Sequence, residues 1–263
     1  MIKFKSKNKD ISYKHDRVVR IISHFKDGTY IVGTGFLVND NRNILTCWHV
    51  ICGVDLKDFL KSAEFQQSVK TTESEKVDEY FRNITSRIEV ELPDGKKITA
   101  ILKSYDYYYD LAVLIIPEGC GKLPFFELEL NDVFDYLDEV NFTGYPRCLG
   151  YELLNSPFAA NVGTISSFPE IDVTGGKYQM TQLTSICIGG NSGAPLFKKG
   201  CNKVYGIVNG YEWRGESNVA VFKDQSFSHT VDIKVPINIS YATELNLLLS
   251  KSDVFKNLVS GDD

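Results

Sequence analysis

Short apolar segments separated by turn-forming residues run through most of this 263-residue chain. They are rich in Val, Ile, Phe, Tyr and Thr, and clusters of Gly, Asn and Asp divide them. Such segments predict β-strands, and their spacing favours a mainly antiparallel barrel or sandwich. Examples are TYIVGTGFLV, NILTCWHV, RIEVELPDGKKITAILKSY, DLAVLII, EVNFTGY, KVYGIVNGY and TVDIKVPI. The Asp94-Gly95 pair in the third segment predicts a tight hairpin turn.

Two segments depart from the strand pattern. Residues 54–84 are polar and charged, with apolar residues at helical spacing, which predicts a helical insertion on the surface. Near the C-terminus, SYATELNLLLSKSDVFKNLV has an amphipathic pattern and opens with Ser240, a candidate N-cap, so a C-terminal helix is expected. Between LPFFELELNDVFDYLDEV and NFTGYP the composition turns acidic, which suggests a crossing between two halves.

The charge pattern excludes some classes of partner. The net charge is −5, with acids and bases interspersed, so no nucleic-acid partner is expected. The chain has no apolar run of about 18 residues, so no membrane span is expected. The lysines at 3, 5, 7 and 9 form either a solvated terminus or a basic arm, and no apolar segment follows them as in a secretory signal. We therefore expect a cytoplasmic protein.

The six cysteines are scattered and lie mostly in apolar, strand-like segments. Their spacing, together with the histidine pattern, does not predict a zinc site, and we expect neither a metal nor another cofactor. A disulfide framework is the alternative, but buried free thiols in a reducing compartment fit the sequence better. They are Cys47, Cys52, Cys120, Cys148, Cys187 and Cys201.

The segment GGNSGAPLF, residues 189–197, places Ser192 between glycines. It is either a surface turn or a loop that exposes a serine and directs backbone N–H groups at a negative group. A serine hydroxyl becomes a nucleophile only when a neighbouring base takes its proton. The choice between the two interpretations depends on whether the chain supplies that base.

Of the four histidines, His49 has the most distinctive setting, at the predicted end of the strand in NILTCWHV. A buried structural histidine is the alternative interpretation. A base of this kind also needs a carboxylate to orient it. The segment YDYYYDLAVLII offers Asp106 and Asp110, and we choose Asp110 because it directly precedes an apolar strand.

Taken together, these residues resemble the chymotrypsin-like (trypsin-fold) serine proteases, and most closely the HtrA-like and other bacterial branches. The resemblance rests on the order His, Asp, Ser within LTCWHV, DLAVL and GNSGAPLF. It extends from about residue 17 to about residue 248 and includes NVGTISS and KVPINIS. It implies an all-β fold of two six-stranded antiparallel β-barrels, with a helical insertion after the His strand and a C-terminal helix. The first barrel, carrying His and Asp, would span residues 1–130, and the second, carrying Ser, residues 131–263.

The resemblance also implies the chemistry of a serine endopeptidase that acts on protein or peptide substrates through an acyl-enzyme. His49 would be the general base, Asp110 its orienting acid and Ser192 the nucleophile. The backbone N–H groups of Gly190 and Ser192 would form the oxyanion hole. By analogy with bacterial defence-associated proteases, the substrate could be a dedicated protein partner.

A specificity pocket follows from the same resemblance. Its base would be Ile186, which is not acidic, so a small or apolar preference is expected. Asp232, on a strand that could close the pocket, is the feature that opposes this expectation. The expected lining is Ile186, Cys187, Ile188, Gly189, Val208, Asn209, Gly210 and Tyr211.

The residue before the nucleophile sets a further expectation. Digestive relatives have an aspartate there, which pairs with a newly freed N-terminal ammonium. Here the residue is Asn191, which has no charge, so activation without N-terminal cleavage is expected. Asn191 would instead hold its loop through amide hydrogen bonds.

Two other functions remain as alternatives. One is a catalytically silent binding module that keeps the fold, and the other is an esterase that uses the same triad. An α/β-hydrolase is disfavoured because its acid and histidine follow the serine in the chain.

Overall fold

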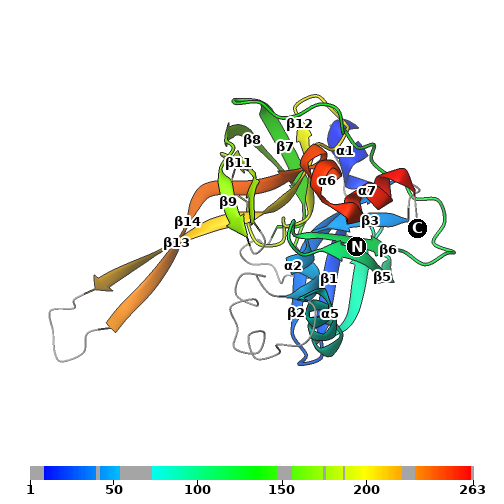
Figure 1. The fold of residues 1–263 in the computed structure, drawn as a ribbon, viewed down its shortest axis with the longest axis horizontal. Coiled ribbons are helices and arrows are strands. Elements are labelled where there is room, and N and C mark those ends of the chain that lie inside the picture. The colour runs from blue at the N-terminus through cyan, green and yellow to red at the C-terminus, as the bar shows by residue number, and fades with distance from the viewer. Residues whose placement is uncertain are drawn as a thin grey trace.

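Two closed six-stranded antiparallel β-barrels form the body of the molecule (Figure 1). The computed structural model describes residues 9–39, 42–53, 73–146, 156–173, 176–185, 187–220 and 229–261. The strand order is β1-β2-β3-β6-β5-β4 in the first barrel and β11-β14-β13-β12-β7-β8 in the second. The predicted fold class is therefore confirmed.

The first barrel is built from six strands, most of which the apolar segments of the sequence predict. The expected hairpin joins its fourth and fifth strands, where Gly95 has a φ of +84° and Leu92 N–H donates to the carbonyl of Lys96 at 2.8 Å. Closure leaves no free strand edge and buries the inward-facing apolar side chains. The strands are β1 (Val18–Phe25), β2 (Tyr30–Val38), β3 (Asn43–Thr46), β4 (Thr85–Glu91), β5 (Lys97–Asp106) and β6 (Leu111–Ile115).

The second barrel uses later strands, two of which are much longer than the barrel needs. Beyond the barrel, β13 and β14 continue as a paired ribbon that projects from the body (Figure 1). A separate two-stranded sheet pairs β9 (Glu170–Val173) with β10 (Gly176–Gln179). The barrel strands are β7 (Glu139–Gly144), β8 (Ala159–Ser167), β11 (Thr181–Leu183), β12 (Ala194–Lys198), β13 (Gly206–Ala220) and β14 (His229–Glu244).

Helices occupy the ends of the chain and the region after β3. A helix is confirmed within the expected insertion at 54–84, as α5 (Glu73–Ile84), whereas residues 54–72 lie outside the described residues. The expectation that His49 ends a strand is wrong. Strand β3 ends at Thr46, and His49 lies on the short helix α2 (Trp48–Cys52).

The C-terminal segment forms two helices rather than one. Strand β14 runs on to Glu244, so Ser240 is a strand residue and not an N-cap. Its hydroxyl donates to the carbonyl of Ser185 at 2.7 Å and accepts from the N–H of Cys187 at 2.8 Å. Helices α6 (Leu245–Lys251) and α7 (Asp253–Ser260) follow, and their buried apolar residues join the core cluster of the first barrel.

The cap of α7 comes from Ser252 instead. Its Oγ accepts from the N–H of Phe255 at 3.4 Å and donates to Asp106 Oδ2 at 2.6 Å. Asp106 also accepts from the N–H of Tyr108 at 3.1 Å. One buried serine therefore begins α7 and joins it to the turn that precedes β6.

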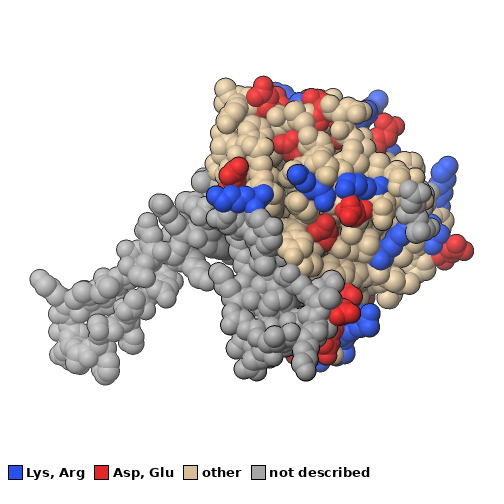
Figure 2. Space-filling view, viewed as in Figure 1, with Lys and Arg blue, Asp and Glu red and all other residues tan. Residues whose placement is uncertain are grey.

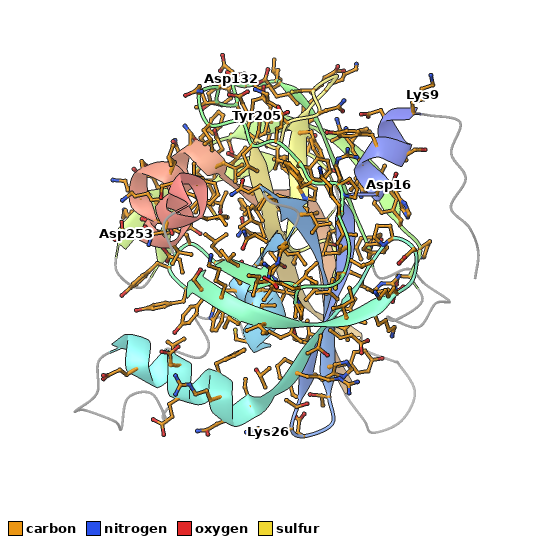
Figure 3. All side chains as sticks on the ribbon, turned by 90° about the vertical axis from the view of Figure 1, so that its right-hand side faces the viewer. Lys9, Asp16, Lys26, Asp132, Tyr205 and Asp253 are labelled. Atoms are coloured by element: carbon orange, nitrogen blue, oxygen red, sulfur yellow. The ribbon has the colours of Figure 1, made fainter. Side chains whose placement is uncertain are left out.

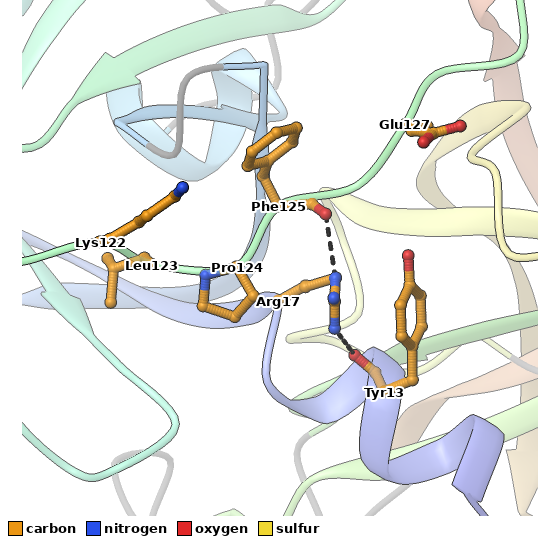
Figure 4. A pocket seen from close by; sticks show the side chains of 7 residues that line it. All are labelled: Tyr13, Arg17, Lys122, Leu123, Pro124, Phe125 and Glu127. Carbon is orange, nitrogen blue, oxygen red and sulfur yellow. Dashed lines mark hydrogen bonds between the residues drawn. The ribbon is translucent and has the colours of Figure 1, made fainter.

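The N-terminal helix α1 (Lys9–His15) connects both halves. The buried amine of Lys14 donates to Asn141 Oδ1 on β7 at 2.6 Å. Arg17 donates to the carbonyls of Tyr13 at 2.7 Å and Phe125 at 2.9 Å and lies over the Tyr13 ring (Figure 4). A cavity of about 470 Å³ opens beside this contact. Because these Arg17 donors bind backbone carbonyls, we interpret the contact as structural. It joins α1 to residues 116–138, the crossing segment that connects β6 to β7.

The crossing segment is tied to the second barrel by polar contacts. Tyr205 Oη donates to Asp132 Oδ2 at 3.1 Å (both labelled in Figure 3), and Lys198 donates to the same oxygen at 3.1 Å. Elsewhere on the surface, acidic and basic side chains alternate over the described part of the face in Figure 2. Among the described residues, the helices are all too short or too polar to cross a membrane.

The cap predicts a stability effect. Ser252→Ala removes the Oγ that caps α7 and the hydrogen bond that this Oγ donates to Asp106. The free energy of unfolding should therefore fall by about 1–2 kcal/mol. Urea unfolding measures it. The control is Ser250→Ala, which removes an exposed hydroxyl bonded within α6 and should change stability by less than about 0.5 kcal/mol. Equal stability of the two variants would contradict the assigned cap.

Candidate active site

Asp110 makes two bonds to His49 and one to the residue before it. Its Oδ2 lies 2.7 Å from His49 Nδ1, and its Oδ1 accepts from the N–H of His49 at 2.9 Å. Its backbone carbonyl accepts from the N–H of Trp48 at 3.1 Å. The first N–H groups of a helix have no partner within it, and the N-cap residue Cys47 makes no side-chain bond to them. Asp110 therefore caps α2 from another segment and fixes the imidazole at the same time.

The backbone of Asp110 is itself unusual. Its φ is +51°, in the left-handed region that few residues other than glycine adopt. Aspartate tolerates this region better than most side chains. Strained backbone of this kind is often retained where it positions a functional group. Here it lies directly before β6 and carries the carboxylate that meets α2.

A packed aromatic pair anchors α2 from the other side. The ring of Trp48 is buried and stacks on that of Tyr105 with centroids 4.1 Å apart. Since Trp48 precedes His49, this packing limits how far the histidine backbone can move. No local sequence pattern indicates this support.

Asn209 extends the network from the second barrel. Its Nδ2 donates to Asp110 Oδ2 at 3.2 Å, and its Oδ1 accepts from Thr243 Oγ1 at 2.8 Å. The expected place of Asn209 is a pocket wall, whereas its side chain is buried against Asp110. No sequence signal distinguished it, because the contact joins residues 99 positions apart.

The carboxyl of Asp110 is held in its ionised form. Burial alone would raise its pKa, but the charge of His49 and hydrogen bonds from His49 and Asn209 outweigh burial and lower the pKa below its usual value. A carboxylate with this bonding favours the imidazole tautomer that carries hydrogen on Nδ1. That tautomer leaves Nε2 as the proton acceptor.

Thr34 on β2 seats the serine loop against the first barrel. Its N–H donates to the carbonyl of Ser192 at 2.8 Å, and its Oγ1 donates to the carbonyl of Gly190 at 2.6 Å. The same Oγ1 accepts from the N–H of Tyr145 at 3.0 Å. Thr34 is fully buried, so these bonds are made away from water. One threonine therefore fixes both ends of the predicted oxyanion turn.

Gly193 lets the two barrels meet. Its φ is +85°, and a Cβ at this position would lie 2.0 Å from the carbonyl oxygen of Thr34 and 3.2 Å from the backbone N of Cys47. Such distances are below van der Waals contact, so only glycine fits. Because Cys47 lies two residues before His49, this contact brings the Ser192 loop next to the segment that carries the histidine.

The predicted oxyanion donors lie in a turn that contains a glycine of positive φ. Gly190 has a φ of +100°, which its missing side chain permits. Within the described part of the chain, the N–H groups of Gly190 and Ser192 donate to no protein acceptor. Ser192 itself is mostly buried, at 9% exposure.

The expectation for Asn191 is not met. Its side chain is 1% exposed, and among the described residues neither Nδ2 nor Oδ1 has a hydrogen-bond partner. The loop is held instead by backbone bonds, from the N–H of Asn191 to Ile188 and from the N–H of Ala194 to Asn191. Thr34, rather than Asn191, supplies the side-chain hydrogen bond to this turn.

The predicted pocket lining is only partly described. Ile186 and the side chain of Tyr211 lie outside the described residues. The side chains of Cys187 and Val208 are buried in the core of the second barrel, so only their backbone could face a substrate. Ile188 is exposed at 44%.

Comparison with known proteins agrees with this architecture. A family model described as the trypsin-like peptidase domain matches residues 33–207, more than half of the chain, and the chain therefore belongs to this family. The active form of the Rv3671c protease from M. tuberculosis is similar in structure, with a TM-score of 0.60 and 18% sequence identity. That match covers 94% of this chain and 85% of the other.

The inactive form of the same protease is also similar. Its TM-score is 0.57 at 17% identity, and the match covers 97% of this chain and 94% of the other. At such identities the likeness concerns the fold. No curated protein sequence matches the chain.

The hydrogen bonds of Thr34 predict that its substitution lowers both stability and turnover. Thr34→Val keeps the shape but leaves the carbonyl of Gly190 and the N–H of Tyr145 without their partner, which should lower the free energy of unfolding by about 1–3 kcal/mol. It should also lower kcat/KM, because the turn between Gly190 and Ser192 loses its anchor.

Thr143→Val is the matched control. Thr143 is equally buried on the neighbouring strand β7, and its hydroxyl has no partner among the described residues, so its loss should be neutral or stabilising. Chemical denaturation and peptide turnover measure both variants. If Thr143→Val were as harmful as Thr34→Val, the assignment of Thr34 would be wrong.

Proposed function

We propose that this member of the trypsin-like peptidase domain family is a serine endopeptidase that uses Ser192, His49 and Asp110. Ser192 Oγ attacks the scissile carbonyl while His49 Nε2 takes its proton. His49 then gives this proton to the leaving amine, and the acyl group remains on Ser192. Water, deprotonated by the same histidine, releases the acyl group and restores the enzyme.

The observation that carries this proposal is the pair of bonds by which the Asp110 carboxylate holds the ring and the backbone N–H of His49. A general base must be fixed in one tautomer and one orientation, and bonds at 2.7 Å and 2.9 Å to a carboxylate with a lowered pKa meet this need. The Gly193 contact beside Cys47 supports Ser192 as the partner of this base.

The proposed oxyanion hole consists of the N–H groups of Gly190 and Ser192. As the tetrahedral intermediate forms, its oxygen gains a negative charge that these donors would stabilise. Each such donor is typically worth about 3 kcal/mol of barrier. The bond from Thr34 to the carbonyl of Gly190 holds the turn that presents them.

We propose protein substrates, and a dedicated protein partner of the bacterial defence type remains part of the proposal by analogy alone. The two alternatives make different predictions. A silent binding module would hydrolyse neither peptides nor esters, and an esterase would hydrolyse esters but not peptide bonds. Turnover of matched ester and amide substrates separates all three functions.

Substitution of the acid tests the catalytic roles. Asp110→Asn should lower kcat by about 10⁴, because the amide favours the wrong imidazole tautomer. Ser192→Ala or His49→Ala should each lower it by several orders of magnitude in a folded protein.

Asp106→Asn is the matched control for the acid. Asp106 bonds Ser252 and the turn at Tyr108, so its change should cost about 1 kcal/mol of stability and leave kcat within a few-fold. Peptide turnover and unfolding curves measure both. A larger loss of kcat in Asp106→Asn than in Asp110→Asn would refute the assigned acid.

The specificity proposal is cleavage after small or apolar residues. It rests on Ile186 at the position that the resemblance makes the base of the pocket. Profiling with a peptide library, with Ser192→Ala as the inactive control, measures the preference. Strong cleavage after Arg or Lys that Asp232→Asn abolishes would overturn this expectation.

A further inference from the structure

We propose that Cys47, His49 and Asp110 form a binding site for a thiophilic divalent cation such as Zn²⁺, and that its occupation switches the peptidase off. The binding site stands on geometry alone, whereas the inhibition rests on the proposed function. The sequence does not predict this metal site, because its ligands come from two distant segments and the cysteine–histidine spacing fits no zinc motif.

The three ligand atoms are already close together. Cys47 Sγ, a ring nitrogen of His49 and a carboxylate oxygen of Asp110 all lie within 4.8 Å of one another. Usual zinc–ligand bond lengths place tetrahedral ligands about 3.5 Å apart. Coordination therefore requires side-chain shifts. The 2.7 Å contact between His49 Nδ1 and Asp110 Oδ2 must open, and the thiol of Cys47 must leave the carbonyl of Val208, which lies 3.4 Å away.

A donor group already occupies the position between two of these ligands. Asn209 Nδ2 lies 3.2 Å from Asp110 Oδ2 and 3.8 Å from Cys47 Sγ. This amide presents its partly positive hydrogens to a carboxylate and a sulfur. A cation on the same two atoms would replace this amide as their partner, so Asn209 Nδ2 must turn away when the ion binds.

The charge of the site also favours a cation. Among the described residues, Asp110 forms its only ion pair with His49, which is charged only when protonated. With a neutral imidazole, the carboxylate has no compensating charge in contact with it. The side chains of His49 and Asp110 are partly exposed, at 32% and 24%, so two of the three ligands meet solvent, whereas Cys47 is buried.

Coordination would disable the base by changing its tautomer. A metal on Nδ1 replaces the proton there, and the neutral ring then carries its hydrogen on Nε2. The nitrogen that should accept the proton of Ser192 becomes a donor. On binding, the thiol proton of Cys47 leaves to solvent, the Nδ1 proton is replaced by one on Nε2, and Zn²⁺ gains sulfur, nitrogen and oxygen ligands.

The ligand set predicts which ions bind. A thiolate and an imidazole favour Zn²⁺ and Cd²⁺, whereas Mg²⁺ and Ca²⁺ prefer sites made of oxygen alone. Inhibition should therefore be specific to thiophilic ions and reversed by EDTA.

Binding is tested first without reference to activity. The intact chain with Ser192→Ala is titrated with Cd²⁺, and the thiolate-to-cadmium charge-transfer absorption is recorded. Cys47→Ala in the same background should remove one equivalent of this absorption. Cys52→Ala is the matched control, since it removes another buried thiol after His49 on α2 and should leave that equivalent in place.

Inhibition is tested next in the active chain. Zn²⁺ should inhibit peptide turnover, and Cys47→Ala should raise the inhibitory concentration at least about tenfold relative to Cys52→Ala, since even indirect changes around metal ligands weaken binding by about 10- to 100-fold. Each variant is compared with its own rate in EDTA. An unchanged cadmium absorption in Cys47→Ala, or equal zinc sensitivity of the two variants, would overturn the metal site. A chain that binds Cd²⁺ through Cys47 but shows no turnover would instead refute the proposed function.

Discussion

The close approach of the serine loop to β2 is the contact on which the rest of the site depends. The Thr34 hydroxyl donates to the carbonyl of Gly190 and accepts from the N–H of Tyr145, and Gly193 lies too near Thr34 for any side chain to fit. These bonds are buried, so breaking one leaves a polar group without water or partner. The barrels are therefore joined where Ser192 must be placed.

The positions of His49 and Asp110 also depend on contacts between the two barrels. Asp110 and His49 belong to the first barrel, while Asn209 and Thr243, which support the acid, belong to the second. A relative shift of the barrels would thus disturb the serine loop and the carboxylate together. This coupling explains why a site built from separate segments can keep one geometry.

Local sequence patterns predict much of the architecture but few of the hydrogen bonds that hold the site. Strand periodicity and the Asp94-Gly95 turn predicted the β-structure, and motif order pointed to His49, Asp110 and Ser192. The missed features are long-range: the contact of Asn209 with Asp110, the anchoring by Thr34, and the break at Ser252 that divides the C-terminal helix. The expected side-chain bonds of Asn191 are not found, because burial of its amide without a partner among the described residues is a tertiary feature that sequence does not reveal.

The most direct test of the central claim is reaction of the intact chain with a fluorophosphonate probe, followed by mass spectrometry of the protein and its peptides. Such probes modify serines that a base activates. The account predicts one adduct per chain, located on Ser192 and lost in His49→Ala although that variant remains folded. A folded wild-type chain without an adduct, or with its adduct on another serine, would contradict it.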